Sequence, residues 1–443
     1  GLDLFSAPFG SVSERHLISR NHSGEEYTMQ CAVTGRSLVV FLGTAIFALA
    51  AIGANAQTET VLHDFTGSPD GAYLQSSALL PLAGALYGVA EFGGADNHGI
   101  IFKLTNSNGT WDETILYSFT GGSDGSYPIG ALIADKAGNL YGVTDAGGTR
   151  NAGVVFELSD SGGSWQETVL HNFGSGFDGA NPQGPLVFDS HGNLFGTTVI
   201  GGGLNGGTVY EMTPANGVWN ETVLHSFGGT NDGFLVYGGL TLDAKGNLYG
   251  TADAGGSNPC MGLGCGIVFE LVAANGWNEK IIHQFAGGSD GINPNSKLVM
   301  DTSGNLYGST VYGGGQGQCS AGIDTTTCGT IYELSPGSND MWTEKILHRF
   351  VGGSGGSEPD SPLTLDGAGN LYGETAQVGS NNGSLFRLSP QVGGGWAFKL
   401  FFTFDGTNGA NPEGGLRISA GTIYGTTIYG GSQGQGVVFS FKP

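Results

Sequence analysis

Short segments that alternate apolar and polar residues run along most of this chain. In the segment 111–119, Trp-Asp-Glu-Thr-Ile-Leu-Tyr-Ser-Phe, the odd-numbered residues share one face of an extended strand. Three shorter apolar runs accompany each such segment, and turns rich in Gly, Asn and Asp separate them. In one copy the four runs are 184–189, 193–198, 207–212 and 219–227. The pattern predicts an all-β unit of four short antiparallel strands.

The unit recurs seven times. One marker is Leu-Tyr-Gly or a close variant, which begins at Leu86, Leu140, Leu194, Leu248, Leu306, Leu371 and Ile423. A second marker has His or an aromatic residue two positions before Phe, and begins at His63, Tyr117, His171, His225, His283, His348 and Phe402. Both markers recur at intervals of 52 to 65 residues. Four strands in each interval are typical of a β-propeller blade, since a β-helix coil has a period of about 20–30 residues.

The two ends of the repeat array complement each other. The seventh copy supplies three strands, at 414–419, 422–427 and 437–441. A lone fourth-strand segment, Glu-Thr-Val-Leu-His-Asp-Phe, stands at 59–65. Pairing this N-terminal strand with the last blade closes the ring and removes the exposed sheet edges. The sequence therefore predicts a seven-bladed β-propeller, with four antiparallel strands per blade, in one domain over residues 57–443.

The N-terminal region has the order of a secretory signal peptide. Residues 29–56 contain Arg36, the apolar run 38–52 and the small-residue site Ala-Asn-Ala at 54–56. The apolar run is shorter than the about 20 residues of a membrane-spanning helix. We therefore expect cleavage before Gln57, a mature chain without a membrane span, and a secreted, periplasmic or cell-surface location. Residues 1–28 precede Met29 and are interpreted as an upstream segment outside the native protein.

Composition narrows the partners and predicts disulfides. The net charge is −23 at pH 7, from 15 Lys and Arg against 38 Asp and Glu, so we expect no nucleic acid partner. Outside the signal peptide, the cysteines are expected to form two disulfides in an exported chain. Local pairing would close two short loops, although four cysteines allow three pairings, and their spacing does not match a zinc site. They are Cys260, Cys265, Cys319 and Cys328.

The repeat also resembles a known family. Its unit reads Gly-Asn-Leu-Tyr-Gly-Thr-Thr, Gly-Gly, Gly-Thr-Val-Tyr-Glu-Leu and Trp-x-Glu-Thr-Val-Leu-His-Ser-Phe. This unit is similar to the GloVer-type tandem repeat of the choice-of-anchor bacterial surface proteins, over essentially all of residues 57–443. The resemblance implies export from a bacterium. It implies no activity and assigns no functional residue.

Residues present in nearly every copy are expected to be structural. The repeat histidines and the one Trp per copy are interpreted as packing residues. Five residues after the repeat Phe an Asp-Gly pair recurs, which is first of all a turn sequence; its members are Asp70, Asp124, Asp178, Asp232 and Asp290. These aspartates could line a calcium site around the axis, but calcium takes six to eight oxygen ligands. We therefore predict no metal or cofactor, with calcium as the alternative.

Departures from the repeat indicate where a ligand site should lie. The loops between the second and third strands of copies four and five, 253–266 and 311–329, are enlarged and contain the cysteines. The sixth copy adds acidic residues near them. Because elaborated loops on a rigid scaffold commonly carry function, we expect ligand-binding residues at Asp253, Glu358, Asp360 and Glu374.

No motif identifies a catalytic reaction. The sequence contains no G-x-S-x-G nucleophile elbow with plausible catalytic partners, no H-E-x-x-H site and no phosphate-binding lysine loop. We therefore expect a monomeric, non-catalytic exported propeller that binds a protein or a glycan. The alternatives are a secreted polysaccharide hydrolase or lyase that uses acids such as Glu91, Glu358 or Glu374, and a structural component of the cell envelope. An enzyme should show an axial pocket with two or more non-repeat carboxylates in mutual reach.

Overall fold

The computed structural model describes residues 59–442 except 77, 175, 229–230, 259, 261, 316–327 and 377–381. In the first compact unit of the chain, Gly1–Ala56, it also describes an antiparallel pair of strands, β1 (Leu17–Arg20) and β2 (Glu26–Met29). The predicted signal peptide lies outside the described residues, apart from Met29. Among the described residues, no helix has the length and apolar character needed to cross a bilayer.

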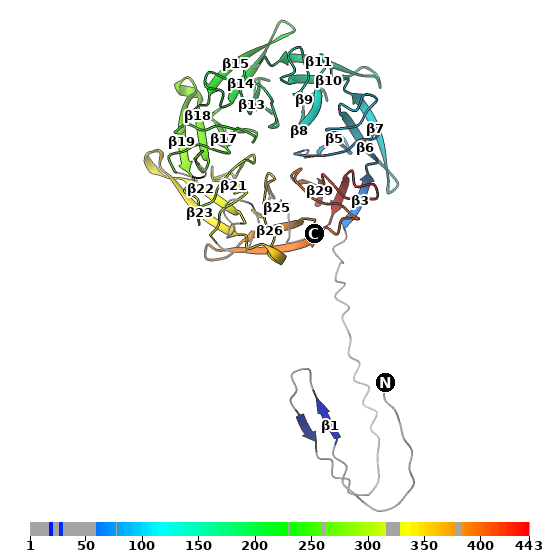
Figure 1. Cartoon of the computed structure of the whole chain (residues 1–443), viewed down its shortest axis with the longest axis vertical. Helices are drawn as coiled ribbons and strands as arrows, with labels where there is room; N and C mark the ends of the chain where they lie inside the picture. The colour runs from blue at the N-terminus through cyan, green and yellow to red at the C-terminus, as the bar shows by residue number, and fades with distance from the viewer. Residues whose placement is uncertain are drawn as a thin grey trace, which may run out of the picture. The chain divides into compact units, whose positions relative to one another are not determined.

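Seven antiparallel sheets of four strands form a ring in the described part of the second compact unit, Gln57–Pro443 (Figure 1). Blade 1 contains β4 (Leu80–Leu82), β5 (Ala85–Ala90), β6 (Ile100–Ser107) and β7 (Thr110–Ser118). Blade 2 contains β8 (Ser126–Ala134), β9 (Leu140–Ala146), β10 (Val154–Asp160) and β11 (Trp165–Asn172). Blade 3 contains β12 (Val187–Phe188), β13 (Leu194–Thr198), β14 (Thr208–Ala215) and β15 (Val218–Ser226).

The remaining blades have the same order. Blade 4 contains β16 (Thr241–Leu242), β17 (Leu248–Ala252), β18 (Ile267–Val272) and β19 (Asn278–Gln284). Blade 5 contains β20 (Val299–Met300), β21 (Leu306–Thr310), β22 (Thr330–Pro336) and β23 (Trp342–Arg349). Blade 6 contains β24 (Thr364–Leu365), β25 (Leu371–Thr375), β26 (Ser384–Pro390) and β27 (Trp396–Thr403). Three short 3-10 turns, η1 (Ala273–Asn275), η2 (Ser338–Asp340) and η3 (Gly353–Gly355), lie between strands.

Blade 7 joins the two ends of the domain, as the sequence predicted. It contains β28 (Arg417–Ser419), β29 (Thr422–Thr426), β30 (Val437–Phe441) and the N-terminal strand β3 (Glu59–Asp64). Strand β3 pairs antiparallel with β30, from Glu59 opposite Phe441 to Asp64 opposite Val437. The predicted seven-bladed ring with an N-terminal closing strand is therefore confirmed.

Six of the seven innermost strands have only two or three residues, whereas β8 of blade 2 has nine. In blade 3 the strand expected at 184–189 covers only Val187–Phe188. In several blades the backbone of the segment before the inner strand accepts a hydrogen bond from the preceding blade: Thr197 Oγ1 of blade 3 donates to the carbonyl oxygen of Gly238, 3.1 Å away, in the segment that leads into blade 4.

The core lies between the blades. Each repeat Trp packs against the second residue of a neighbouring Leu-Tyr-Gly string or its variant, in most cases edge-on, as Trp165 does against Tyr87 with ring centroids 6.4 Å apart. The repeat Phe beside it is fully buried, for example Phe119 and Phe285. These contacts join each blade to its neighbours. The segments that lead into the blades lie closer to the axis of the ring.

A candidate ligand site on the ring axis

The segment that leads into each blade carries one variable side chain toward the axis. Its pattern is Gly-x-x-Pro-x in most copies, as at 179–183. The third residue is left-handed in all seven copies, with φ between 52° and 64°. Asn tolerates this backbone conformation, whereas Tyr73, Tyr127, Leu235 and Glu358 adopt it at a steric cost. The variable fifth residues are Gln75, Ile129, Gln183, Tyr237, Asn295, Asp360 and Glu413.

These side chains, apart from Ile129, line a hollow of about 230 Å³ together with Ser76. Because six different blades contribute to it, the hollow lies on the axis of the ring; we call it the axial pocket. An adjoining hollow contains Glu91 and Asp145, beside Gln75, Ile129 and Gln183. Gln183 Nε2 donates to Asp145 Oδ1 at 2.8 Å. The pocket is thus lined by amides, carboxyls, one tyrosine and one serine.

The carboxyls of this region hold their protons unusually tightly. Burial raises the pKa of Glu413 to about 8, and the charges of Asp360, Glu374, Glu358 and Glu91 contribute to this rise. Burial likewise raises the pKa of Glu91 to about 8, with a contribution from Asp145. Desolvation disfavours the charged form, and neighbouring carboxylates add repulsion. The arrangement therefore provides carboxylic acids that stay protonated near neutral pH.

All four acids that the sequence singled out lie in this electrostatic cluster. Asp360 lines the pocket and accepts a hydrogen bond from Asn295 Nδ2. Burial raises its pKa to about 7, and the charges of Asp253 and Glu358 contribute to the effect. Asp253 Oδ2 accepts a hydrogen bond from Asn293 Nδ2 at 2.9 Å, and burial raises the pKa of Asp253 to about 6.

Glu374 has a supporting position in the cluster. It is 1% exposed, and its Oε2 accepts a hydrogen bond from the backbone N–H of Gly415 at 2.8 Å. Burial raises its pKa to about 7. The sequence prediction gave this buried acid the same rank as Asp360, although only Asp360 lines the pocket.

Sequence reasoning missed most of the pocket lining. Glu413, Gln75, Gln183, Tyr237 and Asn295 were not among the predicted site residues. A sequence feature could have revealed these residues. In the Gly-x-x-Pro-x pattern the residue type at the fifth position differs between most copies, while the Gly and Pro before it are largely kept. Only the ring shows that six of these seven positions meet in one pocket.

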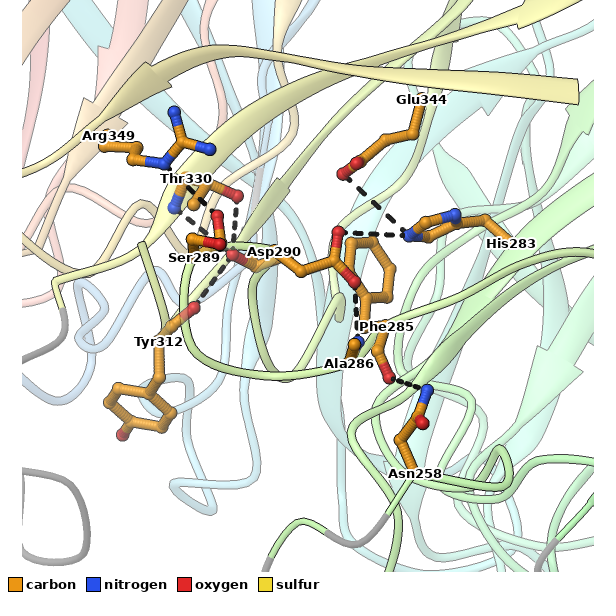
Figure 2. Close-up of polar contacts among 11 residues, drawn as sticks. Asn258, His283, Phe285, Ala286, Ser289, Asp290, Tyr312, Thr330, Glu344 and Arg349 are labelled. Atoms are coloured by element: carbon orange, nitrogen blue, oxygen red, sulfur yellow. Dashed lines mark hydrogen bonds and ion pairs between the residues drawn. The ribbon is translucent and has the colours of Figure 1, made fainter. Parts of the chain in front are cut away.

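The enlarged loop of blade 4 is held by a disulfide. Cys260 and Cys265 are bonded, with their Cα atoms 4.9 Å apart. Asn258 Nδ2 also donates to the carbonyl oxygen of Phe285 at 2.9 Å (Figure 2). Cys328 is disulfide-bonded as well. Its predicted partner, Cys319, lies outside the described residues.

A second polar arrangement repeats between blades, away from the pocket lining. His283 of β19 lies 3.6 Å from Asp290 and 3.8 Å from Glu344 of β23 in the next blade (Figure 2). Asp290 Oδ2 also accepts the backbone N–H of Ala286 at 2.6 Å, as expected for a turn aspartate. In two further sets, the side-chain ligand atoms of a His, an Asp and a Glu lie within 4.8 Å of one another. These sets are His63, Asp70 and Glu113, and His225, Asp232 and Glu279.

The interface between blades 5 and 6 lacks both carboxyls of this polar set. His348 is retained, but Gly355 stands where the aspartate would be and Phe398 where the glutamate would be. The rings of His348 and Phe398 stack with centroids 3.8 Å apart. One imidazole and two carboxylates are a donor set that Zn²⁺ accepts, yet the apolar substitute shows that the position serves to join blades. We therefore assign these residues to packing, as the sequence predicted for the histidines.

Fold and site together define a seven-bladed β-propeller with a polar, acid-rich axial pocket. The Gloeobacter/Verrucomicrobia repeat family matches residues 40–264 and 262–443. The chain therefore belongs to this family. No curated protein matches it.

Several solved structures have similar folds. One is described as a putative oxidoreductase (glucose dehydrogenase) from Thermus thermophilus, with 16% identity, TM-score 0.46, and coverage of 71% of this chain and 96% of the other. A polysaccharide lyase, an ulvan lyase bound to a GlcA–Rha3S saccharide, has 10% identity, TM-score 0.49, and coverage of 86% and 95%. A gluconolactonase from Xanthomonas campestris has 11% identity, TM-score 0.41, and coverage of 87% and 89%. With sequence identities and TM-scores this low, the activities of these proteins are not assigned to this chain.

Proposed function

We propose that this protein is exported and binds a glycan in its axial pocket. The lining of the pocket is the observation that carries the proposal. Gln75, Gln183 and Asn295 each offer an amide that both donates and accepts, as sugar hydroxyls require. Tyr237 adds a ring of the kind that packs against the apolar face of a sugar. The Cys260–Cys265 disulfide is compatible with an oxidising compartment.

The proposal predicts that pocket substitutions weaken glycan binding without unfolding the ring. Tyr237→Ala and Gln75→Ala should each raise the Kd about tenfold, since a lost stacking or hydrogen-bonding contact costs on the order of 1.4 kcal/mol. The measurement is calorimetry on the best ligand from a glycan array, with and without calcium. Gln391→Ala, in an exposed turn between β26 and β27, is the control and should leave the Kd unchanged. Unchanged affinity in both pocket variants, or capture of a protein and no glycan, would contradict the proposal.

A second candidate is hydrolysis or elimination on the bound polysaccharide. The raised pKa values of Glu413 and Glu91 favour it, because a carboxylic acid that keeps its proton near pH 7 can act as a general acid. In this case Glu413→Gln should abolish product formation while the Kd changes by less than about threefold. The wild-type rate should also fall as the pH rises past about 8. Binding without products from any bound polysaccharide would leave the protein a binding module.

A further inference from the structure

The axial pocket continues into a narrower hollow of about 150 Å³. The two share Ser76, Gln183, Tyr237, Asn295 and Asp360. Lys297, two residues before β20, and Arg417, the first residue of β28, line only the narrower part, which we call the inner hollow. Blades 5 and 7 thus bring two cations to the same space.

Neither of these two cations is paired with an acidic side chain in the part of the ring that the structure describes. Among the described residues, no ion pair or hydrogen bond reaches the side chain of Lys297 or Arg417. Asp360 lines the same hollow but accepts a hydrogen bond from Asn295 instead. Burial lowers the pKa of Lys297 to about 8, and the neighbouring charge that acts on it is the like charge of Arg417. Burial also lowers the pKa of Arg417.

The composition of the chain makes this pairing unusual. Only 15 of its residues are Lys or Arg, against 38 Asp and Glu, so carboxylates to neutralise a cation are abundant. Enclosing a charge without a partner is costly, and two like charges in one hollow increase the cost. An arrangement of this kind is stabilised when an anion from outside enters. A guanidinium offers a planar pair of N–H donors for an oxyanion, and an ammonium adds a point charge.

We propose that Lys297 and Arg417 form a subsite for an oxyanion group of the ligand, so that the pocket selects an acidic glycan. This inference rests on the proposed glycan-binding function and specifies its substrate class. The amides of the axial pocket contact sugar hydroxyls, while the inner hollow takes a carboxylate or a sulfate. A carboxylate and a sulfate present the same oxyanion chemistry to the two cations, and the experiment below distinguishes between them.

The test compares matched acidic and neutral sugars by calorimetry on the full chain at about pH 6, where Lys297 is charged. The probes are trigalacturonate, its methyl triester and a sulfated galactotriose. The wild type should bind at least one of the two anionic sugars about ten or more times more tightly than the ester. Lys297→Met and Arg417→Met should reduce that affinity to the level of the ester. Lys399→Met, at an exposed position of β27, is the matched control and should retain the preference.

Thermal unfolding without ligand gives an independent readout. Because each Met substitution removes an unpaired, half-buried charge, Lys297→Met and Arg417→Met should unfold at the same temperature as the wild type or a few degrees higher. A marked fall in unfolding temperature would show that the cations stabilise the fold, and would overturn the subsite. Equal affinity of the wild type for all three sugars would overturn the subsite and leave glycan binding intact. Binding of none of them, or of any glycan on the array, would overturn both proposals.

Discussion

A chain that starts at Thr66, and so lacks β3 and Phe65, is expected to lose its stable monomeric fold. Strand β3 forms one edge of blade 7 and pairs with β30 along its length. Phe65 is fully buried and packs against Phe102 of blade 1 with ring centroids 5.2 Å apart. Removing a buried Phe alone costs about 3–5 kcal/mol, and a whole domain is stable by only about 5–15 kcal/mol. The exposed edge of β30 should in addition promote association between copies.

Size-exclusion chromatography and thermal unfolding measure this effect. A chain that starts at Gln57 retains β3 and is the matched control; it should elute as a folded monomer. A synthetic peptide of residues 57–66 should bind the shortened chain and restore part of its unfolding temperature, because it supplies the missing strand. A shortened chain that stays monomeric and unfolds within about 3 °C of the control would show that β3 does not close the ring in solution.

The second large effect expected is a fall in stability from about pH 5 to about pH 9. Burial, together with the charge and hydrogen bond of Asp232, raises the pKa of Glu279 to about 9. Burial and the neighbouring Asp290 raise the pKa of Glu344 to about 8. The pKa values of Glu91 and Glu413 are also raised to about 8. In the unfolded chain these groups titrate near 4.5. Their stabilising contribution is therefore complete below about pH 4.5 and is lost as the pH rises through about 8 to 9.

Each of these acids should contribute on the order of 2 kcal/mol after solvent screening. We expect the unfolding temperature at about pH 9 to lie at least about 5 °C below that at about pH 5. Glu279→Gln with Glu344→Gln should flatten the profile, because a glutamine amide donates to Asp232 or Asp290 as the protonated acid does. Glu157→Gln, on β10, is the control and should keep the wild-type slope. A profile that rises toward high pH, or an unaltered slope in the double variant, would contradict the assignment.

The two predictions concern features that the sequence revealed to different degrees. The closing strand was visible because 59–65 repeats the fourth-strand segment of every other copy. The coupling of Glu279 to Asp232 was not visible, because the two lie on opposite sides of a blade interface. The packing role of the repeat histidines could be predicted because a histidine recurs in most copies. The acidic side chains that lie beside them could be identified only from the structure.

The same distinction holds for the site. Asp253, Glu358 and Asp360 stood out as departures from the repeat, and the structure places them in one electrostatic cluster. Lys297 and Arg417 belong to different blades, and neither differs from an ordinary surface cation in sequence. The two side chains are close together because the blades form a closed ring, and no local sequence pattern predicts that proximity.

The fold class, the number of blades and the closing strand could all be predicted from the sequence, because side-chain alternation and turn residues recur in every copy. The residues that line the axis became known only from the arrangement of the blades in space. The axial pocket is built from one residue in each of several blades, tens of residues apart along the chain. Their proximity, burial and mutual charge are properties of the closed ring.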